Sequence, residues 1–74
     1  MARFDFLVRQ GERVLHSTVR AEMLDLAAVW HRIDELADQY CTSGVRIIVR
    51  DANGETVISM GVLTIQRMRG VEAA

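Results

Sequence analysis

The sequence predicts an α+β domain in two layers, in which a four-stranded antiparallel sheet carries one amphipathic helix on one face. Three observations lead to this fold class. Apolar and polar residues alternate in two stretches near the start of the chain and in two near its end, as in half-buried strands. A glycine-containing turn separates the stretches of each pair. Between the pairs, apolar residues recur every three or four positions, as in a helix with one buried face.

The first hairpin joins residues 3–10 to residues 14–19 through a two-residue turn that starts with Gly11. Glycine suits the first central position because it tolerates positive φ. This turn sets apolar residues of the two strands opposite each other, whereas a turn shifted by one residue opposes them to polar ones. The predicted pairs are Val8 with Leu15 and Phe4 with Val19.

The helix is predicted to begin after Asp25 and to end at Gly44. Asp25 is the expected N-cap, because its carboxylate can accept a hydrogen bond from a free amide of the first turn. Gly44 can take the left-handed conformation in which many helices end. The apolar stripe that is expected to pack on the sheet contains Leu26, Val29, Trp30, Ile33, Leu36, Ala37, Tyr40 and Cys41.

The second hairpin joins residues 45–51 to residues 56–62 through Asn53 and Gly54. Asn-Gly is a strong signal for a two-residue turn, because both residues accept positive φ. A three-residue loop would lose the match between apolar residues of the two strands. The predicted pairs are Val49 with Ile58, Ile47 with Met60, and Val45 with Val62.

The chain beyond Val62 is expected either to overhang as a strand over residues 63–69 or to begin a short tail, and residues 71–74 are expected to fray. One domain therefore covers residues 1–70. Because the helix connects the two hairpins, a right-handed crossover favours the strand order 2-1-3-4. The predicted core contains Phe4, Phe6, Val8, Trp30, Ile33, Leu36, Ile47, Val49, Ile58 and Met60.

Composition excludes several classes of protein. A chain of 74 residues forms one small domain, whose single core supplies only about 3–5 kcal/mol. One cysteine excludes a disulfide framework and a cysteine-rich zinc site. The net charge of −1 argues against a protein whose main role is to bind the nucleic-acid backbone. No apolar run could span a membrane, and the charged start of the chain is unlike a secretion signal, so a cytosolic domain is expected.

Several short motifs occur in a recognisable order. The chain opens with Met1-Ala-Arg-Phe-Asp-Phe-Leu-Val-Arg-Gln-Gly, continues with Leu24-Asp-Leu-Ala-Ala, and later has Ile48-Val-Arg-Asp-Ala-Asn-Gly-Glu-Thr-Val. Over residues 3–60 this order resembles a family of short bacterial proteins known only as a domain of unknown function. Gln10 stands where that family often has an acid. The resemblance implies no reaction, ligand or cofactor, and it identifies no catalytic residue.

Two local features of the helix could carry chemistry. His31, Asp34, Glu35 and Asp38 share one face, and His and Glu four residues apart can both reach a divalent cation. A closed site needs about four ligands, and no second histidine or cysteine assists, so we interpret this face as solvated surface. Cys41 lies on the apolar stripe, where burial and the helix dipole disfavour a thiolate, so we expect a small buried hydrophobe.

The outer face of the sheet is the most informative predicted surface. Apolar residues lie there at positions that should be wet, and arginines surround them. Arginine suits the rim of an interface, and a dimer would supplement a thin core. The residues expected on this face, together with those that overrun the last strand, are Arg3, Leu7, Arg9, Val14, His16, Arg46, Ile48, Arg50, Val57, Leu63 and Ile65.

The sequence therefore predicts a small, cytosolic, non-enzymatic interaction module that binds a second copy, as a homodimer, or another protein through this face. The alternative is a nucleic-acid-binding regulator in which Arg3, Arg9, Arg46 and Arg50 contact phosphates. Proteins that bind RNA on a sheet face stack bases on exposed aromatic residues, whereas the phenylalanines here are expected in the core. An enzyme ranks third, because no nucleophile or acid–base pair can be identified. No metal or cofactor is expected.

Overall fold

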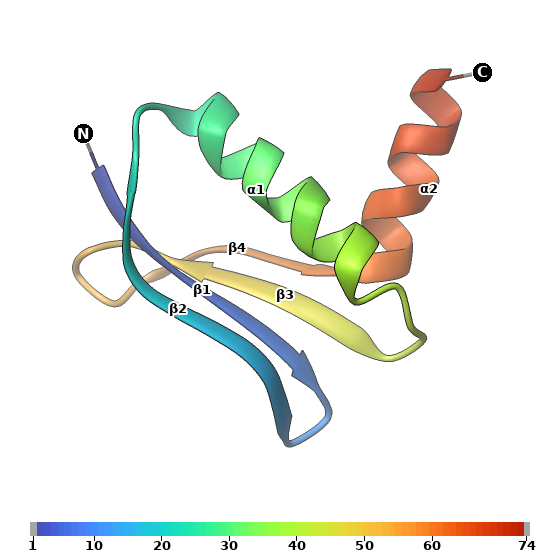
Figure 1. The fold of residues 1–74 in the computed structure, drawn as a ribbon, viewed down its shortest axis with the longest axis horizontal. Coiled ribbons are helices and arrows are strands. Elements are labelled where there is room, and N and C mark those ends of the chain that lie inside the picture. Colours follow the sequence, from blue (N-terminus) through green and yellow to red (C-terminus); the bar gives the residue numbers. More distant parts are fainter. Residues whose placement is uncertain (1, 74) are drawn as a thin grey trace.

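In the computed structural model, the backbone is described for residues 2–73 and the side chains for residues 2–67. The elements are, in chain order, β1 (Ala2–Gln10), β2 (Arg13–Met23), α1 (Leu26–Gln39), β3 (Val45–Arg50), β4 (Thr56–Gly61) and α2 (Val62–Ala73). The strands form one antiparallel sheet in the order β2-β1-β3-β4, which confirms the α+β class and the strand order. Both helices lie on the same side of the sheet (Figure 1).

The hydrophobic core lies between the sheet and the helices. Alternate residues of β1 and β3 point into it, as expected for strands with one wet face. The buried apolar residues are Phe6, Val8, Val29, Ile33, Leu36, Ala37, Val45, Ile47, Val49, Val62 and Ile65, and Phe4, Ile58 and Met60 pack against them half-buried. The predicted core is therefore confirmed in its central strands.

The start of α1 is as predicted, and its end is not. The backbone N–H of Ala28 donates to Asp25 Oδ1 at 2.8 Å, which makes Asp25 the N-cap. The helix ends at Gln39, with Tyr40 as its C-cap, rather than at Gly44. Gly44 has a φ of +83°, but it uses that conformation in the turn that leads into β3.

The apolar stripe of α1 is wider than the surface that the sheet covers. Its centre is buried, but Leu26 in the first turn is 62% exposed and Trp30 on the flank is 38% exposed. Trp30 was predicted in the core, and this prediction is wrong. Cys41 was predicted to be buried, but it is exposed, because the helix has already ended before it.

The turn of the first hairpin is correct, but the predicted pairing behind it fails. Gly11 takes a φ of +62° in a two-residue turn, and the residues on either side of that turn, Gln10 and Arg13, pair with each other. A bulge then inserts Leu15 as an extra residue, so Val8 opposes His16 instead of Leu15. Because side chains alternate between faces, this one-residue shift turns His16 toward the helices.

A second bulge lies farther along β2. Phe4 opposes Ala21 rather than Val19, because two residues, Val19 and Arg20, stand opposite Asp5. Arg20 has a φ of +58°, which is unusual for a residue with a Cβ atom. The second extra residue restores the original alternation, so Ala21 again faces the core.

The second hairpin combines a longer loop with a bulge. Its turn is not the predicted two-residue Asn53-Gly54 turn, because the N–H of Asp51 donates to the carbonyl of Glu55 at 2.9 Å across a three-residue loop. Asp51 Oδ1 also accepts from the N–H groups of Asn53 and Glu55. Gly54 takes the positive φ, +82°, that this loop requires.

A bulge at Val57 compensates for the longer loop. Arg50 pairs with Thr56 and Val49 with Ile58, so Val57 has no direct partner and is 50% exposed. The predicted pairing of Val49 with Ile58 is therefore confirmed, as is that of Ile47 with Met60. The predicted pairing of Val45 with Val62 is wrong, because Val62 already belongs to α2.

The helix α2 replaces the predicted strand overhang or tail. Val62 and Ile65 are buried beside α1, which draws the first turn onto the core. Gln66 links the two helices, since its Nε2 donates to the carbonyl of Ala37 at 3.4 Å and its Oε1 accepts from Cys41 Sγ at 3.0 Å. The helical backbone continues over 71–73, where a frayed tail was expected, and residue 74 lies outside the described residues.

Candidate interaction surface

The face of the sheet turned away from the helices, here called the outer face, has an apolar centre. Leu7 of β1 and Ile48 of β3 stand directly opposite each other, and both are half-buried. Ser17 of β2 is opposite Leu7, and Ser59 of β4 is opposite Ile48. One row across all four strands therefore carries two aliphatic side chains between two serines.

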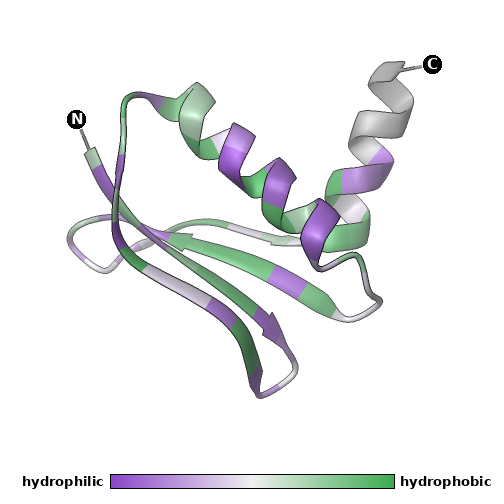
Figure 2. Cartoon of the chain, in the orientation of Figure 1, coloured by the Kyte–Doolittle hydropathy of each residue, from purple (hydrophilic) through white to green (hydrophobic). Residues whose placement is uncertain are grey.

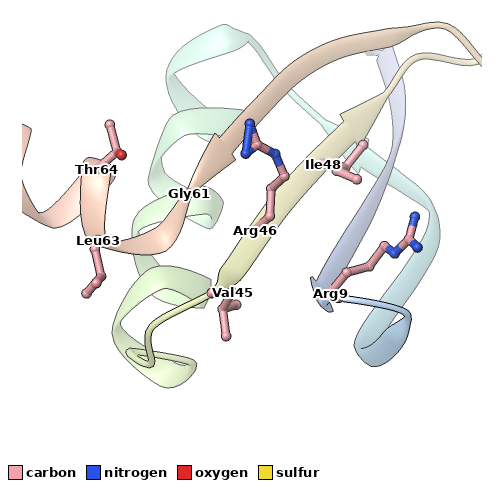
Figure 3. Close-up of a pocket in the computed structure, with 9 residues that line it drawn as sticks. Arg9, Val45, Arg46, Ile48, Gly61, Leu63 and Thr64 are labelled. Carbon is pink, nitrogen blue, oxygen red and sulfur yellow. The ribbon is translucent and has the colours of Figure 1, made fainter.

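The next row of the outer face is basic. Arg9 and Arg46 stand directly opposite each other, with Val14 beyond Arg9 and Gly61 beyond Arg46. Like charges in directly opposed positions destabilise a strand pair. The two side chains diverge in Figure 3, and Arg46 Nε donates to Ser59 Oγ at 3.1 Å.

A hollow of about 340 Å³ lies at this end of the outer face. Arg9, Arg46 and Ile48 line it from the sheet, and Leu63 and Thr64 line it from the first turn of α2 (Figure 3). It is open, with apolar and basic walls. Sequence reasoning could not find the contribution of Thr64, because it did not predict α2.

A third row of the outer face, on the other side of Leu7 and Ile48, pairs Asp5 with Arg50. The carboxylate of Asp5 is hydrogen-bonded to another residue. Asp5 Oδ1 accepts from the backbone N–H of Arg20 at 2.8 Å, on the side of β2 rather than of β3. Among the side chains of residues 2–67, no ion pair forms to Arg9, Arg46 or Arg50. The outer face therefore carries net positive charge around its apolar centre.

The remaining predicted residues of the face divide into two groups. Val14 is 55% exposed, Val57 is 50% exposed, and Leu63 is 46% exposed beside the hollow. Arg3, at the far end of the face, forms an exposed ion pair in which its Nε lies 3.7 Å from Glu22 Oε1. These residues are available for contact, together with the central rows.

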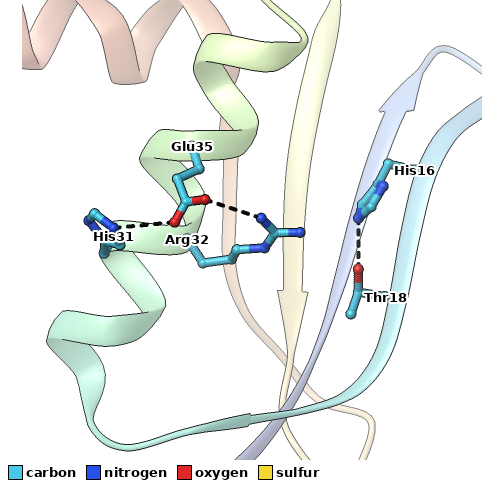
Figure 4. Close-up of polar contacts among 5 residues, drawn as sticks. All are labelled: His16, Thr18, His31, Arg32 and Glu35. Carbon is cyan, nitrogen blue, oxygen red and sulfur yellow. Dashed lines mark hydrogen bonds and ion pairs between the residues drawn. The ribbon is translucent and has the colours of Figure 1, made fainter.

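His16 and Ile65 were predicted on the outer face, and both predictions are wrong. The first bulge of β2 places His16 on the helix side, where its ring centroid lies 6.0 Å from that of Tyr40. Its Nε2 is 2.7 Å from Thr18 Oγ1, which the same bulge has moved to that side (Figure 4). Ile65 is only 4% exposed, because α2 packs it into the core.

The polar group on α1 forms a small network at the surface. Glu35 Oε1 lies 3.2 Å from His31 Nε2, and Glu35 Oε2 lies 3.4 Å from Arg32 Nη1 (Figure 4). In the described part of the chain, no three His, Cys, Asp or Glu residues come together in a way that could hold a metal ion. No described helix is long and apolar enough to cross a membrane.

No protein-family model, curated protein or solved structure matches the chain. The resemblance to short bacterial proteins of unknown function therefore stays an expectation from the sequence.

Proposed function

We propose that the protein is a small cytosolic, non-enzymatic interaction module that self-associates through its outer face, in the simplest case as a homodimer. The observation that carries this proposal is the pair of Leu7 and Ile48 at the centre of a sheet face that neither helix covers. An apolar centre with an arginine rim is the usual composition of a protein interface.

The small size of the domain supports the same proposal. A chain of 74 residues has a thin core that rarely supplies more than about 3–5 kcal/mol. Covering Leu7, Ile48, Val14 and Leu63 would remove further apolar surface from water, which contributes about 25 cal/mol for each Å² of apolar surface buried. Association would thus stabilise the fold as well as perform the function.

A non-enzymatic role is supported by the chemistry of the outer face. Its described side chains are arginines, serines, Thr56, the acids Asp5 and Glu22, and aliphatic residues, with no histidine or cysteine to activate a hydroxyl group. His16 and Thr18 do lie within hydrogen-bond distance, but on the helix side, next to Tyr40. The hollow beside Arg46 adds the hydroxyl of Thr64 and no base.

The test is the mass of the protein in solution from micromolar to hundreds of micromolar concentration, by light scattering and sedimentation. We expect the mass to rise with concentration, and Ile48→Asp to give a folded monomer, because a charge then lies at the centre of the face. Arg13→Glu, an exposed substitution at the turn, is the control. A wild-type chain that stays monomeric throughout would refute the proposal.

A second candidate function is nucleic-acid binding, which the charges of Arg9, Arg46 and Arg50 favour, since none of them forms an ion pair among the described side chains. It predicts binding to duplex DNA or RNA that falls steeply as salt rises and is lost in Arg46→Ala. The phenylalanines of β1 lie on the helix side, so the outer face has no aromatic platform for bases. We therefore place this function second.

A further inference from the structure

Two features of the surface remain without a role. One is the basic row of the outer face, in which Arg9 and Arg46 oppose each other without an acidic partner among the described side chains. The other is the exposure of Leu26 and Trp30 on α1, at 62% and 38%. One arrangement accounts for both.

Leu26, Trp30, Asp34 and Asp38 are spaced four residues apart, so they form one row along α1, here called the helix row. Its first half is apolar and its second half is acidic. Hydrophilic residues recur along this helix in Figure 2, and the only arginine among them is Arg32. Asp34 and Asp38 each have an interaction within the chain. With Glu35 they outnumber Arg32, so α1 itself carries net negative charge.

The helix row and the outer face are complementary in composition. The outer face has an apolar row next to a basic row, and the helix row has an apolar half next to an acidic half. Contact between two outer faces would instead set arginines against arginines, and like charges across an interface oppose binding. Charge therefore favours contact between unlike surfaces.

We infer that the outer face of one copy binds the helix row of a second copy, head to tail. This inference rests on the proposed self-association and names the surface that the outer face contacts. The sheet then has helices on both faces, a layer arrangement that buries both sides of a sheet. Each contact leaves one outer face and one helix row free, so association continues past the dimer unless a ring closes.

The test uses one variant of each surface. Arg46→Glu makes the outer face repel the acidic helix row. Leu26→Glu places a charge where the apolar half of that row would cover Leu7 and Ile48, and burying that charge against aliphatic side chains opposes binding. Both substituted side chains are exposed, and an acid in the first turn suits the helix dipole. Arg13→Glu, at the first residue of β2, and Ala52→Glu, in the loop of the second hairpin, are charge-matched controls at exposed positions. Circular dichroism checks that every variant is folded.

We expect each variant alone to be monomeric and both controls to associate like the wild type. An equimolar mixture of Arg46→Glu and Leu26→Glu should form a dimer and nothing larger, because it combines one intact outer face with one intact helix row. Added salt should weaken the wild-type association, because opposite charges attract across the contact.

Four results would overturn the inference. If Leu26→Glu associates like the wild type while Ile48→Asp does not, the outer faces contact each other, and only the proposed self-association stands. The same conclusion follows if salt strengthens association. If the mixture stays monomeric, the outer face of one copy does not bind the helix row of another, and the inference fails. If the wild type never associates, the proposed function fails and the inference fails with it.

Discussion

The carboxylate of Asp5 holds the backbone of Arg20 in an unusual conformation. Asp5 Oδ1 accepts a hydrogen bond of 2.8 Å from the N–H of Arg20, whose φ is +58°. The contact joins β1 to the second bulge of β2. It also explains why Asp5 does not neutralise Arg50, its direct partner on β3.

This contact predicts opposite effects for substitutions of its two residues. Asp5→Ala should lower the free energy of unfolding by about 1 kcal/mol, because the hydrogen bond is lost, whereas Asp5→Asn keeps an acceptor and should cost less. Arg20→Gly should raise it by about 0.5–1 kcal/mol, because glycine adopts positive φ without the penalty of a Cβ atom. Urea unfolding measures all three. Destabilisation by Arg20→Gly would contradict this explanation.

The two neighbouring isoleucines of β3 should respond differently to the same substitution. Ile47 is fully buried and Ile48 lies on the outer face. Ile47→Asp should unfold the domain, since an unpaired charge in the core costs more than a small domain can lose. Ile48→Asp should retain the circular dichroism of the wild type. The reverse result would mean that the register of β3 is shifted by one residue.

Cys41 should react with a thiol reagent in the native protein. Its side chain is exposed, and its Sγ donates to Gln66 Oε1 at 3.0 Å. Native reaction with an aromatic disulfide reagent should therefore go to completion at the rate of an accessible thiol. Reaction that waits for unfolding by denaturant would show that α2 covers this thiol more fully.

Two apolar residues in the first turn of α2 should differ in their contribution to stability. Ile65 is 4% exposed and Leu63 is 46% exposed. Ile65→Ala should lower the free energy of unfolding by about 2–4 kcal/mol, because it leaves a cavity in the core. Leu63→Ala should change it by about 0.5 kcal/mol. Equal effects of the two substitutions in urea unfolding would argue against the packing of this helix.

The sequence was sufficient wherever one local pattern decided the structure. Alternation placed Phe6 and Val8 in the core, and the capping role of Asp25 needed only its own carboxylate and the next turn. Leu7 and Ile48 followed from the same alternation, since the opposite parity must face outward. The centre of the candidate surface could therefore be predicted.

Prediction failed where two local signals disagreed. In the second hairpin the loop chemistry of Asp51 and the apolar match of Val49 with Ile58 require different registers, and the bulge at Val57 satisfies both. In the first hairpin the position of His16 depends on a bulge that the residues of the turn do not predict. Bulges are settled by contacts between strands, which a single sequence does not display.

The sequence did not predict α2 for a different reason. Only Val62 and Ile65 of its first turn are known to be buried, and two residues three apart are too few to establish a helical period. Leu63 lies between them and is exposed beside the hollow, so the apolar run resembles a continuing strand. For this reason Ile65 was wrongly predicted on the candidate surface, and Thr64, which lines the hollow, was not predicted there.

The bulges also determine where the sheet can grow. The central pair of β1 and β3 is regular, whereas each edge strand departs from regular pairing, β2 twice and β4 once. Irregular edges make poor templates for a further strand, and natural sheets use them to prevent sideways extension. Both edges of this sheet therefore resist amyloid-like extension. Because the helices cover one face, another molecule can contact the sheet only at its outer face.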